Sequence, residues 1–183
     1  MMAGLTPTPS DNAQTSNADV TSEAVYWQGT YAITDKLNAT LGVRKSDDES
    51  DYTIEMTTTS PGIPFVQVPG KWSEVLEFGS TDPKLVLDYS FNEKTMGYVS
   101  VSSGYKSGGF SFATWSESES RGGFNEEELD ATEIGVKYKS SDNRLVVNAA
   151  YYEYDYTDQQ QQSIVVTQSG SLAGKTFNAG ESE

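Results

Sequence analysis

A two-residue alternation of apolar and polar side chains, interrupted by short polar turns, constrains this chain most. In Leu37–Arg44 and Glu133–Tyr138, every second residue is aliphatic or aromatic, and those between are mainly polar or glycine. This period is typical of β-strands with one apolar and one hydrated face. The hydrated face is too polar for the core of a soluble sandwich. The pattern therefore favours a transmembrane β-barrel with a watery interior.

Short turns and long polar segments alternate along the chain. The short turns are Thr34–Lys36, Asn92–Lys94 and Ser141–Asn143, and each predicts a hairpin. Short turns at one end and long loops at the other are typical of outer-membrane barrels. We expect an all-β fold: an antiparallel up-and-down meander forming about seven strands of a larger, partial transmembrane β-barrel.

The domain organisation follows from composition. Residues 1–22 are rich in Thr, Ser, Asn and Asp, which predicts a disordered or loop segment. Residues 23–183 are assigned to the partial barrel. The longest predicted strand is 144–166, where a parity slip at Tyr151–Tyr152 indicates a β-bulge.

Aromatic residues cluster toward both ends of the predicted strands. Two aromatic girdles at the membrane interfaces would explain this. The turn-side group is Tyr31, Tyr89 and Phe91 with the aliphatic Ile33, and the loop-side group is Tyr105, Tyr152, Tyr154 and Tyr156.

Charge and composition exclude several function classes. The formal net charge is −15, from 27 acidic and 12 basic residues, which disfavours nucleic-acid binding. The chain has no Cys and no His, which removes thiol catalysis, the usual zinc sites and a histidine general base. We assign no catalytic residue, cofactor site or metal site, and expect no enzyme activity.

Several segments resemble the barrel of TonB-dependent outer-membrane receptors, over about residues 24–183. They are Leu37–Arg44, Pro83–Asn92, Tyr98–Phe110, Glu126–Lys137, Asn148–Gln160 and Asn178–Gly180. The resemblance implies a large barrel around a plug domain in the outer membrane of a Gram-negative bacterium. It also implies TonB-coupled uptake of a scarce nutrient such as a ferric siderophore, with outer-membrane lipid, an iron chelate and TonB as partners. No plug, TonB box, signal peptide or terminal aromatic residue is recognisable, so we expect a piece of such a receptor.

The resemblance places ligand selectivity in the long segments 46–72, 107–125 and 167–175. These supply Trp72, Phe110, Trp115 and acidic groups, but the ligand-binding residues remain unassigned. A second set shares the polar parity and would point into the lumen, where it would contact a plug or line a hydrated wall. This set is Arg44, Asp88, Glu133, Lys137, Arg144 and Asn148.

Other polar clusters fit ordinary surface roles better than chemistry. The acidic run Asp47–Asp51 could bind Ca²⁺, but it lacks EF-hand spacing, and a solvated loop explains it and Glu126–Glu128 better. Asp155 and Asp158 could pair as acid and base, although nothing in the sequence sets their separation. Gly104–Gly109 lacks the spacing of a phosphate-binding loop.

Two other classes fit the pattern less well. One is a passive porin-like small barrel, and the other is a soluble extracellular carbohydrate-binding β-sandwich with its apolar parity buried between two sheets. An open sheet would have two unpaired edges, which invite aggregation. We therefore expect this chain alone not to be a well-behaved monomer in plain buffer.

Overall fold

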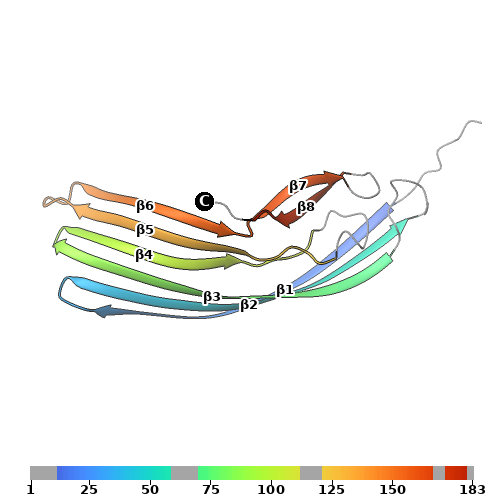
Figure 1. The fold of residues 1–183 in the computed structure, drawn as a ribbon, viewed down its shortest axis with the longest axis horizontal. Helices are drawn as coiled ribbons and strands as arrows, with labels where there is room; N and C mark the ends of the chain where they lie inside the picture. The colour runs from blue at the N-terminus through green and yellow to red at the C-terminus, as the bar shows by residue number, and fades with distance from the viewer. Residues whose placement is uncertain (1–11, 59–69, 112–120, 167–171, 181–183) are drawn as a thin grey trace, which may run out of the picture.

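A bent antiparallel sheet of six strands dominates the computed structural model, which describes residues 12–58, 70–111, 121–166 and 172–180. The strands follow chain order: β1 (Asn12–Ala32), β2 (Leu37–Thr58), β3 (Gly70–Asn92), β4 (Thr95–Lys106), β5 (Glu127–Lys139) and β6 (Val146–Thr157). A separate hairpin, β7 (Gln160–Val166) and β8 (Leu172–Asn178), lies beside the loop end of this meander (Figure 1). The all-β antiparallel meander expected from the alternation is confirmed. No helix long and apolar enough to span a membrane occurs in the described parts of the chain.

The three short turns close the hairpins at one end of the sheet (Figure 1). A side-chain oxygen organises each turn by accepting a backbone hydrogen bond. Thr34 Oγ1 accepts from Leu37 N at 3.0 Å, Asn92 Oδ1 from Lys94 N at 2.9 Å, and Asp142 Oδ1 from Arg144 N at 3.2 Å. Such local bonds are the reason that Thr, Asn and Asp favour turns.

The strands extend further toward the loop end than the sequence predicted. β1 begins at Asn12, so assigning residues 12–22 to a loop was wrong; residues 1–11 lie outside the described residues. β2 continues to Thr58 and β3 starts at Gly70, which corrects much of the expected 46–72 loop. Continuous pairing from Asn12↔Thr58 to Ala32↔Asn38 satisfies the backbone there, so a polar composition does not prevent a strand.

The segment 144–166 also differs from expectation. It forms two strands, β6 and β7, separated at Asp158, whose φ is 52°. The β5–β6 register runs unbroken from Glu128↔Thr157 to Lys139↔Val146, so the bulge predicted at Tyr151–Tyr152 is absent. Near Tyr151–Tyr152 the apolar residues change from odd-numbered to even-numbered positions because the two faces of the sheet change polarity along the strand.

The two faces of the sheet exchange polarity partway along the strands. We call the face on which Phe110 packs the inner face, and the opposite face the outer face. Side chains directly opposite one another in a ladder share a face, so the pairing assigns each residue to a face. In the turn-side half, every position assigned to the outer face is apolar, glycine or proline. We call these outer-face positions the apolar belt; they lie within 25–31, 37–43, 83–89, 97–101, 134–138 and 147–151.

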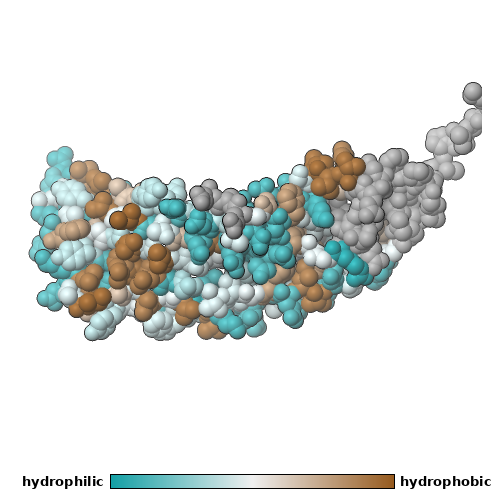
Figure 2. Space-filling view, in the orientation of Figure 1, coloured by the Kyte–Doolittle hydropathy of each residue, from teal (hydrophilic) through white to brown (hydrophobic). Residues whose placement is uncertain are grey.

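The apolar belt is uncovered in this structure. Ile134 is 59 % exposed and Tyr151 69 %, which does not fit the alternative β-sandwich, where this parity would be buried. Figure 2 shows hydrophobic residues gathered over the turn-side half of the sheet, with a separate group at the β7–β8 hairpin. Beyond the belt, the outer face becomes mainly polar and the inner face becomes aromatic and aliphatic.

Candidate functional site

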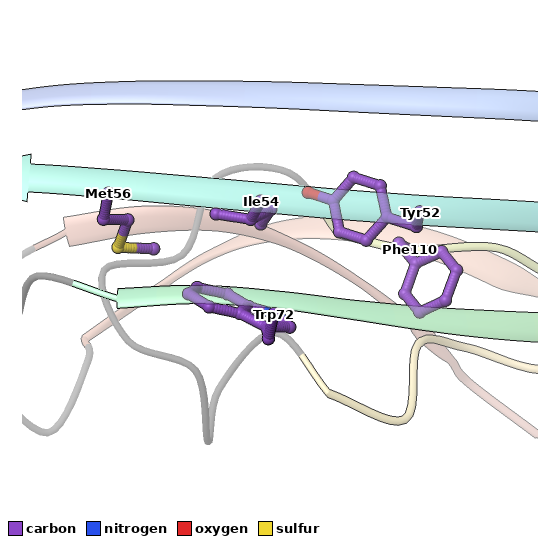
Figure 3. Packing of buried hydrophobic residues seen from close by; sticks show 5 residues of the cluster. All are labelled: Tyr52, Ile54, Met56, Trp72 and Phe110. Carbon is purple, nitrogen blue, oxygen red and sulfur yellow. The ribbon is translucent and has the colours of Figure 1, made fainter.

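The inner face beyond the apolar belt, on the loop side, forms the candidate site. Its buried part is a cluster of Tyr52, Ile54 and Met56 from β2, Trp72 from β3, and Phe110 from the segment after β4 (Figure 3). The Phe110 and Tyr52 rings stack with centroids 4.6 Å apart and planes 21° apart. Burial raises the pKa of the Tyr52 hydroxyl to about 12, so this group stays neutral.

Two of the three aromatic residues predicted to contact ligand therefore belong to this packed wall. Trp72 and Phe110 are only 5 % and 6 % exposed, so they pack inside the wall and present little surface to a ligand. Trp115 lies outside the described residues.

A solvent-exposed aromatic surface lies on the inner face of β6. Tyr152 pairs with Glu133 and Tyr154 with Ala131, which places both side chains on the inner face. The two rings stack with centroids 4.9 Å apart and remain 58 % and 38 % exposed. The sequence pattern predicted that both tyrosines lie in an outer girdle, and this prediction was wrong because β6 has no bulge.

A polar cluster separates this aromatic wall from the turn-side interior. Arg44, Asp48, Asp82 and Tyr105 line one hollow of about 780 Å³. Tyr105 donates a hydrogen bond to the Asp48 carboxylate. Desolvation and this hydrogen bond raise the pKa of Tyr105 above its ordinary value.

Tyr105 thus faces inward, not outward with Val99 and Val101 as the alternation predicted. β4 pairs with β3 only as far as Ser102. Beyond Ser102, β4 is no longer paired with β3, and the Tyr105 side chain reaches Asp48 on β2.

The remaining lumen residues predicted from parity are mostly on the inner face. Asp88 accepts a hydrogen bond from Asn38 Nδ2 at 2.8 Å, and Glu133 accepts one from the Tyr98 hydroxyl. The Lys137 Nζ lies 5.3 Å from the centroid of the Tyr98 ring. Asn148 is opposite Lys137, whereas Arg144 lies in the β5–β6 turn and not in a strand.

The segment after β4 is fastened to the β7–β8 hairpin by side-chain amides. Asn178 Nδ2 donates to the carbonyl oxygens of Asn125 at 3.0 Å and Asp158 at 2.8 Å. Gln160 Nε2 donates to Ser107 O at 2.9 Å and Asn125 O at 3.0 Å. Four stretches distant in sequence are therefore held together beside the inner wall.

The acidic residues considered for chemistry do not form a metal site. Asp47, Glu49 and Asp51 lie on the outer face of β2 and Asp48 on the inner face. In the part of the chain that the structure describes, no three carboxylates are grouped so that they could hold a metal ion. Asp155 lies on β6 opposite Asp130, while Asp158 is in the β6–β7 turn.

Comparison with known proteins agrees with this architecture. Residues 3–183 match the family model of the TonB dependent receptor-like β-barrel, and the chain belongs to this family. The crystal structure of the ferric yersiniabactin uptake receptor FyuA from Yersinia pestis is similar, with a TM-score of 0.73 and 20 % identity. The closed form of the ferric-catecholate import receptor Fiu from E. coli K12 is similar with a TM-score of 0.60 and 17 % identity.

The chain is short relative to these receptors. The FyuA alignment covers 93 % of this chain and 23 % of the receptor, and the Fiu alignment covers 87 % and 24 %. The likeness therefore concerns about a quarter of each receptor chain, and the described strands do not close a barrel.

Proposed function

We propose that this chain forms part of an outer-membrane receptor for TonB-coupled uptake of a scarce nutrient such as a ferric siderophore. The main support for this function is the exchange of polarity between the two faces of the sheet. An apolar outer face suits lipid in the turn-side half. An exposed aromatic inner face suits a ligand on the loop side, since ligand sites are lined mainly by apolar and aromatic side chains.

The proposal includes the partners and location implied by the family. Outer-membrane lipid covers the belt in a Gram-negative cell, a plug domain occupies the inner face, and TonB supplies energy coupling. Membership of the receptor family and the similarity to two iron-chelate receptors support these partners and this location. The chain has no His and no Cys, which supports a role in transport without catalysis.

Uptake by cells tests the proposal. The complete gene product containing this chain would be expressed in a Gram-negative host lacking its own iron-chelate receptors. Radioactive iron supplied as a panel of chelates should enter these cells, and uptake should disappear when the host lacks TonB. Iron entry that is equal with and without TonB would contradict the proposal and favour a passive pore.

A further inference from the structure

Carboxylates face one another across neighbouring strands on the outer face, just beyond the apolar belt. The directly opposed pairs are Glu23↔Asp47, Asp19↔Asp51, Glu49↔Glu77 and Asp130↔Asp155. Like charges in this position destabilise a sheet. These pairs lie on β1–β3 and on β5–β6, with no carboxylate on β4 between them, so the loop end of the wall carries a negative band in two parts.

The opposite end of the sheet has the other sign. At the short turns, the basic residues Lys36, Lys94, Lys139 and Arg144 outnumber the acidic residues Asp35, Glu93 and Asp142. Among the described residues, the excess of negative charge therefore lies away from the short turns. A surface of one sign attracts ligands of the opposite sign and slows the approach of like-charged ones.

In the described part of the inner wall, the hollow beside the polar cluster holds charges of both signs. Arg44 and Lys84 line the same hollow as Asp48 and Asp82, so the charges there offset one another. The exposed aromatic surface on this wall is the Tyr152–Tyr154 stack. Tyrosine faces attract cations and pack against uncharged groups.

We infer that the cargo is an uncharged or cationic metal chelate, and that chelates with several negative charges are selected against. This inference rests on the proposed uptake function and adds the charge class of the substrate. The negative band governs the approach of the chelate, and the tyrosine stack provides a contact surface that carries no positive charge.

The test compares iron chelates of different charge in the uptake assay. The panel contains a cationic trihydroxamate, an uncharged trihydroxamate and an anionic tricatecholate iron(III) chelate. We expect TonB-dependent uptake of the first two and a rate about tenfold lower for the third at low ionic strength. The difference should shrink as salt screens the field.

A charge-neutralising variant isolates the role of the band. Glu49→Gln, Asp51→Asn and Glu77→Gln together remove three outer-face charges without changing the inner wall. Uptake of the anionic chelate should rise about threefold or more at low salt, because the repulsive field weakens. The control variant, Asp35→Asn with Glu93→Gln, removes two charges at the turn end and should leave uptake unchanged.

The outcomes separate this inference from the proposed function. TonB-dependent uptake that favours the anionic chelate would overturn the inference and leave the function intact. An equal response of the loop-side and turn-side variants would also overturn it. Absence of TonB-dependent uptake for all three chelates would overturn both.

Discussion

At the scale of single residues, Gly123 allows the segment after β4 to lie against the inner wall. Its φ is +55°, and an added Cβ would lie 2.2 Å from the carbonyl oxygen of Gly109. Gly109 and Phe124 exchange backbone hydrogen bonds of 2.8 and 3.0 Å at this crossing. Neighbouring Gly122 also has a positive φ, +84°, but an added Cβ there would meet nothing within 4 Å.

Alanine substitutions at these two glycines should have unequal effects. Both variants incur the cost of a left-handed backbone, about 1–2 kcal/mol. Gly123→Ala should lose about 1–3 kcal/mol more, because its methyl group forces the crossing apart. Denaturant unfolding and hydrogen exchange at residues 107–111 would measure this in the complete gene product in detergent. Equal destabilisation by Gly122→Ala would contradict the close approach.

The carboxylate of Asp142 stabilises the β5–β6 turn. It accepts from Ser140 Oγ at 2.6 Å and from Arg144 N at 3.2 Å. These hydrogen bonds, from Ser140 first, lower the pKa of Asp142 below its ordinary value. A depressed pKa in the folded state means that the stabilisation is present at neutral pH and is lost as pH falls through the folded pKa.

Asp142→Ala should therefore lower the unfolding temperature at neutral pH. The difference from the parent protein should vanish in acid, well below the ordinary aspartate pKa of about 3.9, where both turns lack a charged carboxylate. Melting curves over a pH series would show this. Glu93→Ala, in the neighbouring turn, controls for the loss of one charge.

At the scale of elements, one side chain of β7 couples the hairpin to the main sheet. Gln160 Nε2 reaches the carbonyl oxygens of Lys106, Ser107 and Asn125, at 3.3, 2.9 and 3.0 Å. Its neighbour Gln161 donates instead to Gln159 Oε1 within the same strand region. The two residues alternate in direction, as successive strand residues do.

Gln160→Ala should loosen the hairpin, and Gln161→Ala should not. Removing Gln160 leaves carbonyl oxygens that lose a donor, which typically costs about 1–3 kcal/mol when the group is desolvated. Hydrogen exchange across β7 and β8 should accelerate only in the Gln160 variant. Similar exchange in both variants would show that the hairpin is held by other contacts.

The negative band also makes a prediction about the stability of paired strands. Glu49 is directly opposite Glu77, whereas Glu55 is opposite Lys71, with 3.5 Å between Glu55 Oε2 and Lys71 Nζ. Glu49→Gln should stabilise the β2–β3 pair by about 0.2–1 kcal/mol at low salt, and the gain should fade as salt is added.

The matched substitution Glu55→Gln removes the same charge from the same face of the same strand. It should be neutral or slightly destabilising, because an exposed ion pair contributes little. Denaturant unfolding at two salt concentrations would compare them. A stabilising effect of the same size from Glu55→Gln would indicate general charge repulsion and not a pairwise effect.

At the scale of the whole molecule, the six-stranded sheet is a wall with an apolar belt on one side only. Within the described residues, β1 pairs only with β2 and β6 only with β5. Edges of this kind are not tolerated in a bilayer. The expectation that the isolated chain is a poor monomer remains a prediction that size-exclusion chromatography can test.

The belt predicts where a charge blocks assembly. Val136 lies in the belt on β5, and Thr132 lies on the same face beyond it. Val136→Lys should cost about 2–4 kcal/mol near the middle of the bilayer, and a lysine near the interface much less. The folded fraction in outer-membrane preparations of the complete gene product should drop for Val136→Lys and not for Thr132→Lys. Equal yields would argue that lipid does not cover this face.

The sequence by itself determined the fold class, the three short turns and the polarity of the turn-side half. The two-residue period and local turn chemistry around Thr34, Asn92 and Asp142 act between near neighbours, so they can be recognised without a structure. The family membership, shown by the match over residues 3–183, agrees with the resemblance of the same segments.

Only the tertiary structure decided how the loop-side half is built. Partway along the strands, the apolar side chains move from the outer face to the inner face. For this reason the polar strands resemble loops in the sequence, and the unbroken β6 resembles a strand with a bulge. The stacking of Phe110 on Tyr52 joins residues far apart in sequence, and the position of the Tyr152–Tyr154 stack on the inner face depends on the pairing of β6 with β5. The register of each strand pair sets those contacts, because a shift of one residue would move every side chain of a strand to the other face.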